Sequence, residues 1–197
     1  IGGQGNFGSK LTSKLRNCND AELVIKPTDD THHNGELVRE ADVVLLTVQP
    51  QDVLPVLDEI RQAIPASAEV ISFAAAVPTE LMKQALGRPV ARAMMNPDAT
   101  FGAFLATGEK ESFFRSLFKE LLQLPDLTVA DDQAMDSFTV AISYLYTIVN
   151  WAYAQECSEQ WLQVHLNHVA DQLPASKTTL EKVTRQVKKQ GNFKAHI

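Results

Sequence analysis

Short apolar runs alternate with amphipathic segments along the first half of the chain. The runs at 43–48, 68–75 and 89–96 consist mostly of apolar residues, which is typical of strands buried on both faces of a parallel sheet. Between the first two runs, residues 51–64 place apolar side chains at helical spacing. This alternation predicts an α/β fold whose parallel strands are joined by right-handed crossovers.

The same patterns predict further elements. We expect residues 10–15 to form the start of a helix, and a second helix to begin at Pro78 or Thr79 and end before Gly87. The other expected elements are a strand at 21–26, a short helix at 36–41, strands at 102–107 and 127–130, and a helix at 109–124.

The pattern changes at Asp131. The residues that follow contain almost no turn chemistry, so we expect one very long helix or two abutting helices, capped by Asp131 or Asp132. The segment between Phe138 and Tyr153 is apolar nearly all round, and a helix that is apolar on every side is buried on every side. A partner chain is the expected cover.

The predicted organisation is an α/β domain at 1–130 followed by an all-helical dimerisation domain at 131–197. A final amphipathic, basic helix is expected at 177–190. Few residues precede the first glycine motif, whereas a strand normally needs about 5 residues. We therefore expect the first strand of the protein to begin before Ile1.

Composition and charge narrow the functional classes. The 197 residues are 45% hydrophobic and carry a net charge of −6, which supports a buried core and argues against a nucleic-acid surface. No apolar run approaches the roughly 20 residues that span a bilayer. Cys18 and Cys157 are far apart, which favours a cytoplasmic protein with free thiols over a secreted disulfide scaffold.

The stretch GQGNFG has the spacing G-x-G-x-x-G and is followed by a helix. In a dinucleotide-binding turn, one glycine allows the bend, the next lets the backbone approach a pyrophosphate, and the third lets helix and strand pack closely. The pyrophosphate lies on the helix N-terminus. The motif predicts a Rossmann-type NAD(P)-binding domain, although a merely flexible N-terminus is the alternative. The expected cofactor-binding residues here are Gly3, Gln4, Gly5, Asn6, Phe7 and Gly8.

The end of the second strand should face the 2′ position of the cofactor ribose. NAD binders usually have an acidic residue there, whereas this chain has Lys26, with Thr28 beyond it. A cation and a hydroxyl suit a 2′-phosphate, so NADP is the expected cofactor. Asp29 and Asp30 lie close by and keep NAD open, and an exposed strand end is the alternative role for Lys26.

Other strand ends carry residues suited to a nicotinamide, because ligands of open α/β sheets bind outside the carboxyl ends of strands. Pro50 can form an apolar wall, or it simply ends its strand. Small side chains in FAAAVP, which ends the next strand, let a flat ring approach, or they serve tight packing. Asn96 can donate and accept at once, which suits a carboxamide. The cofactor residues predicted here are Thr47, Val48, Gln49, Pro50, Ala74, Ala75 and Asn96.

The histidines do not predict a metal site. His165 and His168 are three apart, near Glu156 and Cys157, but no further ligand follows the usual pattern. A solvated helix face is the favoured interpretation.

The order and spacing of these motifs resemble the pyrroline-5-carboxylate reductase family. The resemblance covers most of residues 1–155, through GQGNFGSKL, ADVVLLTVQPQDV, VISFAAAVPTELMKQALG, VARAMMNPDATFG and DDQAMDSFTVAISYLY, and the ending SKTTLEKVTRQVKKQGNF resembles the family's close. It implies an NAD(P)-binding domain, a helical homodimerisation domain, and reduction of a small-molecule substrate, the cyclic imine pyrroline-5-carboxylate, to L-proline. It also implies that Thr178 or Thr179 holds the imine nitrogen or the carboxylate.

The substrate-side motifs depart from the family pattern. The lysine of VKPQ is Gln49 here, SGSGPAY reads ISYLYTI at 142–148, and PGGTT reads ASKTT at 175–179. Lys177 would then replace the lost glycine amides. The stretch between the first helix and ADVV is also short, as if a helix and a strand were absent. Three interpretations stay open: this reductase, a degenerate NADP-binding homologue without catalysis, and a reductase of another imine or carbonyl compound.

Overall fold

The structure is a computed structural model that describes residues 1–17, 25–28, 33–97, 99–105, 111–117, 119, 122 and 128–172. Its elements in chain order are α1 (Asn6–Arg16), α2 (Asn34–Leu37), η1 (Val38–Glu40), β1 (Val43–Leu46), α3 (Pro50–Ile60), β2 (Glu69–Ser72), α4 (Thr79–Leu86), β3 (Ala91–Met95), β4 (Gly102–Leu105), α5 (Glu111–Ser116), α6 (Asp132–Ala154) and α7 (Glu159–Gln172). The chain divides into two compact units, Ile1–Val140 and Ala141–Ile197.

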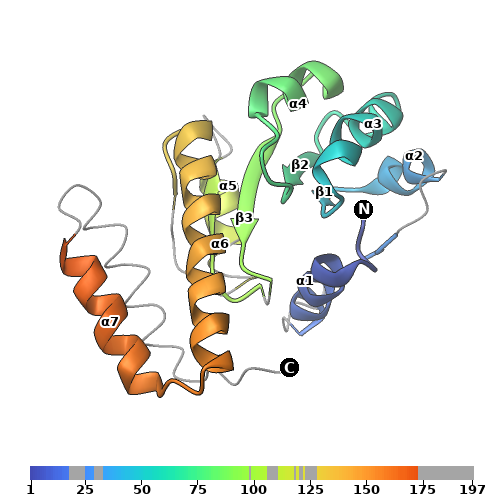
Figure 1. The fold of residues 1–197 in the computed structure, drawn as a ribbon. Helices are drawn as coiled ribbons and strands as arrows, with labels where there is room; N and C mark the ends of the chain where they lie inside the picture. The colour runs from blue at the N-terminus through green and yellow to red at the C-terminus, as the bar shows by residue number, and fades with distance from the viewer. Residues whose placement is uncertain are drawn as a thin grey trace. The chain divides into compact units, whose positions relative to one another are not determined.

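The first unit is built on a four-stranded sheet in the order β1-β2-β3-β4 (Figure 1). β1, β2 and β3 run parallel, and the helices α3 and α4 form the crossovers between them. β4 is antiparallel to β3, because the short turn between these strands cannot carry the chain back to the other end of the sheet. The predicted α/β fold with parallel strands is confirmed, and an antiparallel strand lies at its edge.

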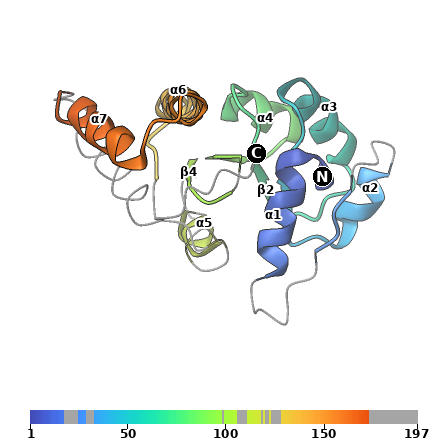
Figure 2. The same ribbon diagram turned by 60° about the horizontal axis from the view of Figure 1, so that its bottom comes forward.

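Helices cover both faces of this sheet (Figure 2). Residues of α3 and α4 pack with β1 on one face, whereas residues of α1 and α5 pack with β3 on the other. Neighbours in β2 alternate between the two clusters: Val70 belongs to the first and Ile71 to the second, and they are 1% and 0% exposed. Burial on both faces is the reason that the strands read as nearly continuous apolar runs.

Proline and glycine mark the helix ends. Pro50 lies in the first turn of α3, where its missing N–H costs no helical hydrogen bond. Pro78 precedes Thr79, the first residue of α4, and Gly87 ends that helix with a φ of 82°. A left-handed φ suits glycine because it has no Cβ. The predicted start and end of α4 are confirmed.

The long apolar segment forms two helices, α6 and α7. Asp131 accepts a hydrogen bond from Ala134 N at 2.7 Å, so its predicted role as a cap is confirmed. Glu156 has a φ of 57°, and Cys157 N donates to Ala152 O at 2.9 Å, which separates α6 from α7. A buried cluster in the second unit joins the two helices through Val149, Ala152 and Leu162.

Two predicted strands differ from the structure. The described end of the predicted strand at 21–26, Ile25 and Lys26, is not a strand. The predicted strand at 127–130 is reduced to a single parallel bridge between Phe104 and Thr128.

The remaining predictions concern helices. The predicted helix at 109–124 is present as α5 in part of its described length, and the helix expected at 177–190 lies outside the described residues. None of the described helices is both long enough and apolar enough to cross a membrane.

Candidate functional site

The glycine turn follows Ile1, a single residue that pairs with the end of β1, and it precedes α1. The backbone nitrogen of Ile1 donates to Leu45 O at 2.8 Å, and Thr47 N donates to Ile1 O at 2.9 Å, which is the pattern of a parallel ladder. On the other side, Gly2 N donates to Thr28 O at 2.7 Å. The turn therefore lies at the carboxyl end of β1 and leads directly into α1, which is the place of a dinucleotide-binding turn in an α/β sheet.

The three glycines of the motif have different surroundings. A Cβ at Gly8 would overlap the carbonyl oxygen of Gly2, and a Cβ at Gly3 would lie 2.7 Å from the Cβ of Pro27. Among the described residues, a Cβ at Gly5 would meet only Gly2 O, at 3.4 Å. Gly3 and Gly8 thus permit close packing of the backbone, whereas the space beside the Cα of Gly5 is open. This is the division of roles that a diphosphate-binding turn needs.

The start of α1 is suited to an anion. Its N-cap is Gly5, which has no side chain to cap the first turn, and that turn contains no acidic residue. Gln4, Gly5 and Asn6 are exposed. The positive end of the helix dipole can therefore act on a diphosphate that approaches the turn.

Two other predicted cofactor segments lie at the same edge of the sheet. Phe73 N donates to Leu46 O at 2.9 Å, so the loop after β2 begins level with the loop after β1. In the loop after β1, the Thr47 hydroxyl donates to Ile1 O at 3.0 Å, and Gln49 is exposed. The structure thus brings together the glycine turn, residues 47–50 and residues 74–75.

Two predicted cofactor residues are used by the fold itself. Asn96 Oδ1 accepts hydrogen bonds from the backbone nitrogens of Thr100 and Phe101, both at 2.9 Å, and its Nδ2 donates to Thr100 Oγ1 at 2.9 Å. Its amide therefore holds the turn between β3 and β4. The ring of Phe7 packs on the core, 5.6 Å from the ring of Phe73. Cofactor binding by these two side chains stays a prediction.

Lys26 is exposed and forms an ion pair near the turn. Its Nζ lies 3.3 Å from Glu40 Oε2, and the two side chains are 56% and 82% exposed. The next residue, Pro27, is the one that packs against Gly3. An exposed ion pair contributes only about 0–1 kcal/mol, so a phosphate can displace Glu40 from Lys26.

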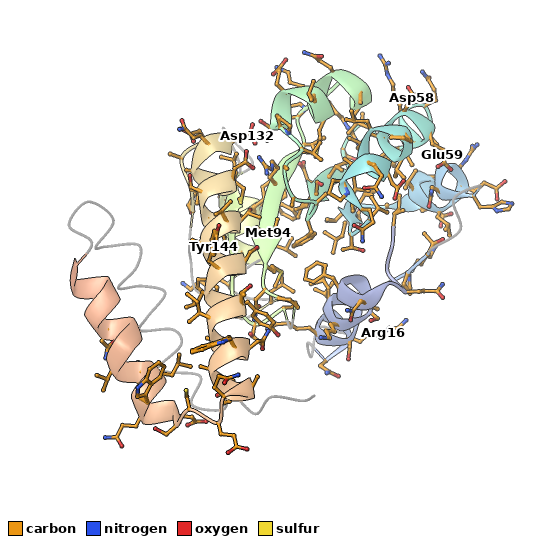
Figure 3. All side chains as sticks on the ribbon, viewed as in Figure 1. Arg16, Asp58, Glu59, Met94, Asp132 and Tyr144 are labelled. Atoms are coloured by element: carbon orange, nitrogen blue, oxygen red, sulfur yellow. The ribbon has the colours of Figure 1, made fainter. Side chains whose placement is uncertain are left out.

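A charged cluster that the sequence patterns did not reveal lies at the start of α6. Arg92 of β3 is 1% exposed; its Nη1 donates to Asp132 Oδ1, and its Nη2 donates to Asp136 Oδ1 at 2.7 Å. Asp132 Oδ2 accepts from N and Oγ1 of Thr79, at 2.9 and 2.6 Å. Figure 3 shows Asp132 in the first turn of α6, beside α4 and β3. An arginine inside an apolar strand is the sequence signal that could have found this cluster.

The surroundings of Asp132 lower its pKa. Burial by itself raises the pKa, but hydrogen bonds from the Thr79 hydroxyl, from Arg92 and from Thr79 N, together with the charge of Arg92, outweigh burial. The carboxylate is therefore ionised throughout the neutral range and accepts three hydrogen bonds.

The predicted catalytic residues Thr178 and Thr179 lie outside the described residues. His165 and His168 belong to α7. In the part of the chain that the structure describes, no group of three or more His, Cys, Asp and Glu residues could hold a metal ion.

The sequence is similar to known oxidoreductases. Residues 1–76 match the family described as NADP oxidoreductase coenzyme F420-dependent. The chain is 39% identical to the pyrroline-5-carboxylate reductase of Methanosarcina acetivorans over 82 residues. This alignment covers 41% of this chain and 29% of that protein. It is 30% identical to the pyrroline-5-carboxylate reductase of Corynebacterium melassecola over 154 residues. That alignment covers 66% of this chain and 56% of that protein. The chain thus spans about a quarter to just over half of the curated relatives it matches.

A solved structure has a similar fold. The pyrroline carboxylate reductase of Plasmodium falciparum, crystallised with NADP bound, matches with a TM-score of 0.58 and 17% identity, over 94% of this chain and 73% of that chain. At this identity the likeness establishes the fold alone.

We expect Asp132 to stabilise the protein at neutral pH and to lose this effect in acid. Because folding lowers its pKa, its contribution is complete above the unfolded value of about 4 and is lost as the pH falls through the folded pKa. Asp132→Asn should lower the free energy of unfolding by about 2 kcal/mol at neutral pH, and by much less in strong acid. Urea unfolding followed by tryptophan fluorescence measures both values, and an equal loss at both pH values would contradict the expectation.

Proposed function

We propose that this chain, a divergent member of the pyrroline-5-carboxylate reductase family, is an NAD(P)H-dependent reductase of pyrroline-5-carboxylate or a similar small cyclic imine. The observation that carries the proposal is the geometry of the glycine turn. Gly8 lets α1 close on the turn, and Gly5 leaves open backbone at the carboxyl end of β1. That combination fits a dinucleotide diphosphate.

The proposed cofactor is NADP, with NAD as the alternative. The glycine turn and the start of α1 would hold the diphosphate, and Lys26 would pair with the 2′-phosphate. The loops at 47–50 and 74–75 would lie against the nicotinamide half. When bound, the reduced cofactor supplies the hydride, and the residues of this chain orient the reactants and exclude water.

The substrate side of the proposal depends on the family resemblance. Thr178 or Thr179 would donate a hydrogen bond to the imine nitrogen or to the carboxylate of the substrate. Lys177 would pair with that carboxylate, and its flexible stem would hold the substrate less firmly than glycine amides. The division of labour would follow the predicted domains, with cofactor binding in 1–130 and substrate binding and dimerisation in 131–197.

A second candidate function is NADP binding without reduction. It is favoured by residues 142–148, which are bulky and lie inside α6, where the family pattern is small and glycine-rich. Turnover assays with NADPH separate the candidates. Oxidation of NADPH by pyrroline-5-carboxylate supports the reductase, binding without oxidation supports the second candidate, and oxidation only with another imine or carbonyl compound changes the substrate.

We also propose that the helical region forms a homodimer. Val140, Tyr144, Ile148 and Trp151 are 54%, 68%, 47% and 57% exposed and recur at helical spacing along α6, so they share one face. An exposed apolar face of this kind marks an interaction site, and a second copy of the chain would cover it. A cytoplasmic location belongs to the same proposal, because Cys157 is a free thiol.

Gly5→Glu should abolish NADPH binding without unfolding the protein. The new side chain would start in open space but would place a carboxylate where the diphosphate lies. We expect a loss of at least about 100-fold in affinity, measured by calorimetry. Gly8→Ala is the contrasting variant: it should destabilise the fold by about 1–3 kcal/mol, because its Cβ overlaps Gly2 O. Unchanged affinity in Gly5→Glu would refute the proposed function.

The pair of Lys26 and Glu40 should set the preference between NADPH and NADH. Lys26→Met should weaken NADPH binding by about tenfold and leave NADH binding almost unchanged, because only NADPH has the 2′-phosphate. Glu40→Gln is the matched variant and should strengthen NADPH binding about threefold, because it frees Lys26. Parallel titrations with both cofactors measure this, and equal effects on the two would exclude the pair from 2′-phosphate recognition.

Charge on the apolar face of α6 should separate the proposed dimer. Tyr144→Glu combined with Ile148→Glu should shift the sedimentation coefficient from dimer to monomer, because burying two carboxylates costs several kcal/mol. Asn150→Glu is the control, since Asn150 is exposed on a different face of α6. A wild-type protein that sediments as a monomer at every concentration would contradict the dimer.

A further inference from the structure

The first residue of α6 caps a different helix. α4 begins after Pro78, a residue with no side-chain group that could accept a hydrogen bond from the first turn. Asp132 Oδ2 takes this place: it accepts from Thr79 N at 2.9 Å and from Thr79 Oγ1 at 2.6 Å. The N-terminus of α4 is therefore fixed by a carboxylate that arrives from a helix 53 residues later in the chain.

This carboxylate is itself held in place. Its other oxygen accepts from Arg92, which is 1% exposed and also binds Asp136. The next turn of α6 buries Met135 completely, and Phe138 packs its ring 5.7 Å from that of Phe101. Asp132 thus has little freedom to move away from Thr79.

The loop at 73–78 follows β2 and leads into Thr79, the first residue of α4. The near end of this loop is fixed by the bond from Phe73 N to Leu46 O, at 2.9 Å, and by the bond from Ala74 N to Ser72 Oγ, at 3.3 Å. At its exposed tip, Ala76 has a φ of 57°, which is unfavourable for alanine. Such a conformation persists only when the surroundings determine it, and here they act from both ends.

The place of this loop relates it to the nicotinamide half of a dinucleotide. The glycine turn holds the diphosphate, and the segment with Lys26 lies on one side of it, where the adenosine ribose binds. The loops after β1 and β2 lie on the other side, at the carboxyl ends of the strands. A ligand that continues past the diphosphate in that direction meets the loop at 73–78.

We propose that Asp132 is a positioning residue that holds the loop at 73–78 against the nicotinamide half of the cofactor through Thr79. The inference rests on the proposed dinucleotide binding and adds a residue outside the Rossmann strands to it. The effect of Asp132 should therefore depend on whether the ligand contains a nicotinamide.

Two ligands separate a positioning role from a structural one. NADPH contains both halves of the dinucleotide, whereas 2′,5′-ADP contains only the adenosine half with its phosphates. Asp132→Ala should weaken NADPH binding by about tenfold and leave the affinity for 2′,5′-ADP unchanged. Thr79→Val, a milder change that keeps the backbone donor, should weaken NADPH binding by about threefold, and Thr79→Ser should restore it.

Asp136→Asn is the matched control, because Asp136 binds Arg92 but has no hydrogen bond with Thr79 in the described structure. It should leave both affinities within about twofold of the wild type. Equal losses for the two ligands, or no loss for either in Asp132→Ala and Thr79→Val, would overturn the positioning role while the proposed function stands. A wild-type protein that binds neither ligand would overturn both.

Discussion

The contact between α1 and the turn before it is the constraint on which the candidate site depends. A side chain at Gly8 would overlap Gly2 O and come within 2.7 Å of Thr47 Oγ1, so only glycine lets the helix begin directly against the end of β1. That closeness puts the positive end of the helix dipole at the edge where the strand ends gather. The proposed dinucleotide site follows from this geometry more than from any single polar side chain.

Polar groups near this edge serve the fold or a ligand according to how firmly they are held. Asn96 uses its amide oxygen and one amide N–H to fasten a turn. Lys26 belongs to an exposed pair that a phosphate can displace at little cost. Asp132 is held by a buried arginine and can transmit position without touching a ligand. The bonding partner and the burial of each side chain decide whether it serves the fold or a ligand, because its residue type alone would permit either role.

α6 contributes residues to both compact units of the chain. Its first turns belong to the unit of the sheet, and its later residues belong to the second unit. The family model matches residues 1–76, whereas the departures from the pyrroline-5-carboxylate reductase pattern lie at 142–148 and 175–179. Cofactor binding is therefore supported by geometry as well as by similarity, and reduction of a particular imine is supported by similarity alone.

The strands of the sheet, the ends of α4 and the glycine turn could all be predicted from local patterns in the sequence. Strands buried on both faces appear in the sequence as apolar runs. Pro78 and Gly87 act on the residues next to them in the chain, so the start and end of the helix between them are also visible locally. The amide of Asn96 bonds to Thr100 and Phe101, four and five residues along the chain, so this use of the side chain is local. Only the packed fold shows that Arg92 meets Asp132 and Asp136, 40 and 44 residues away. Such pairings depend on which strand lies beside which helix, and no local period in the sequence encodes that choice.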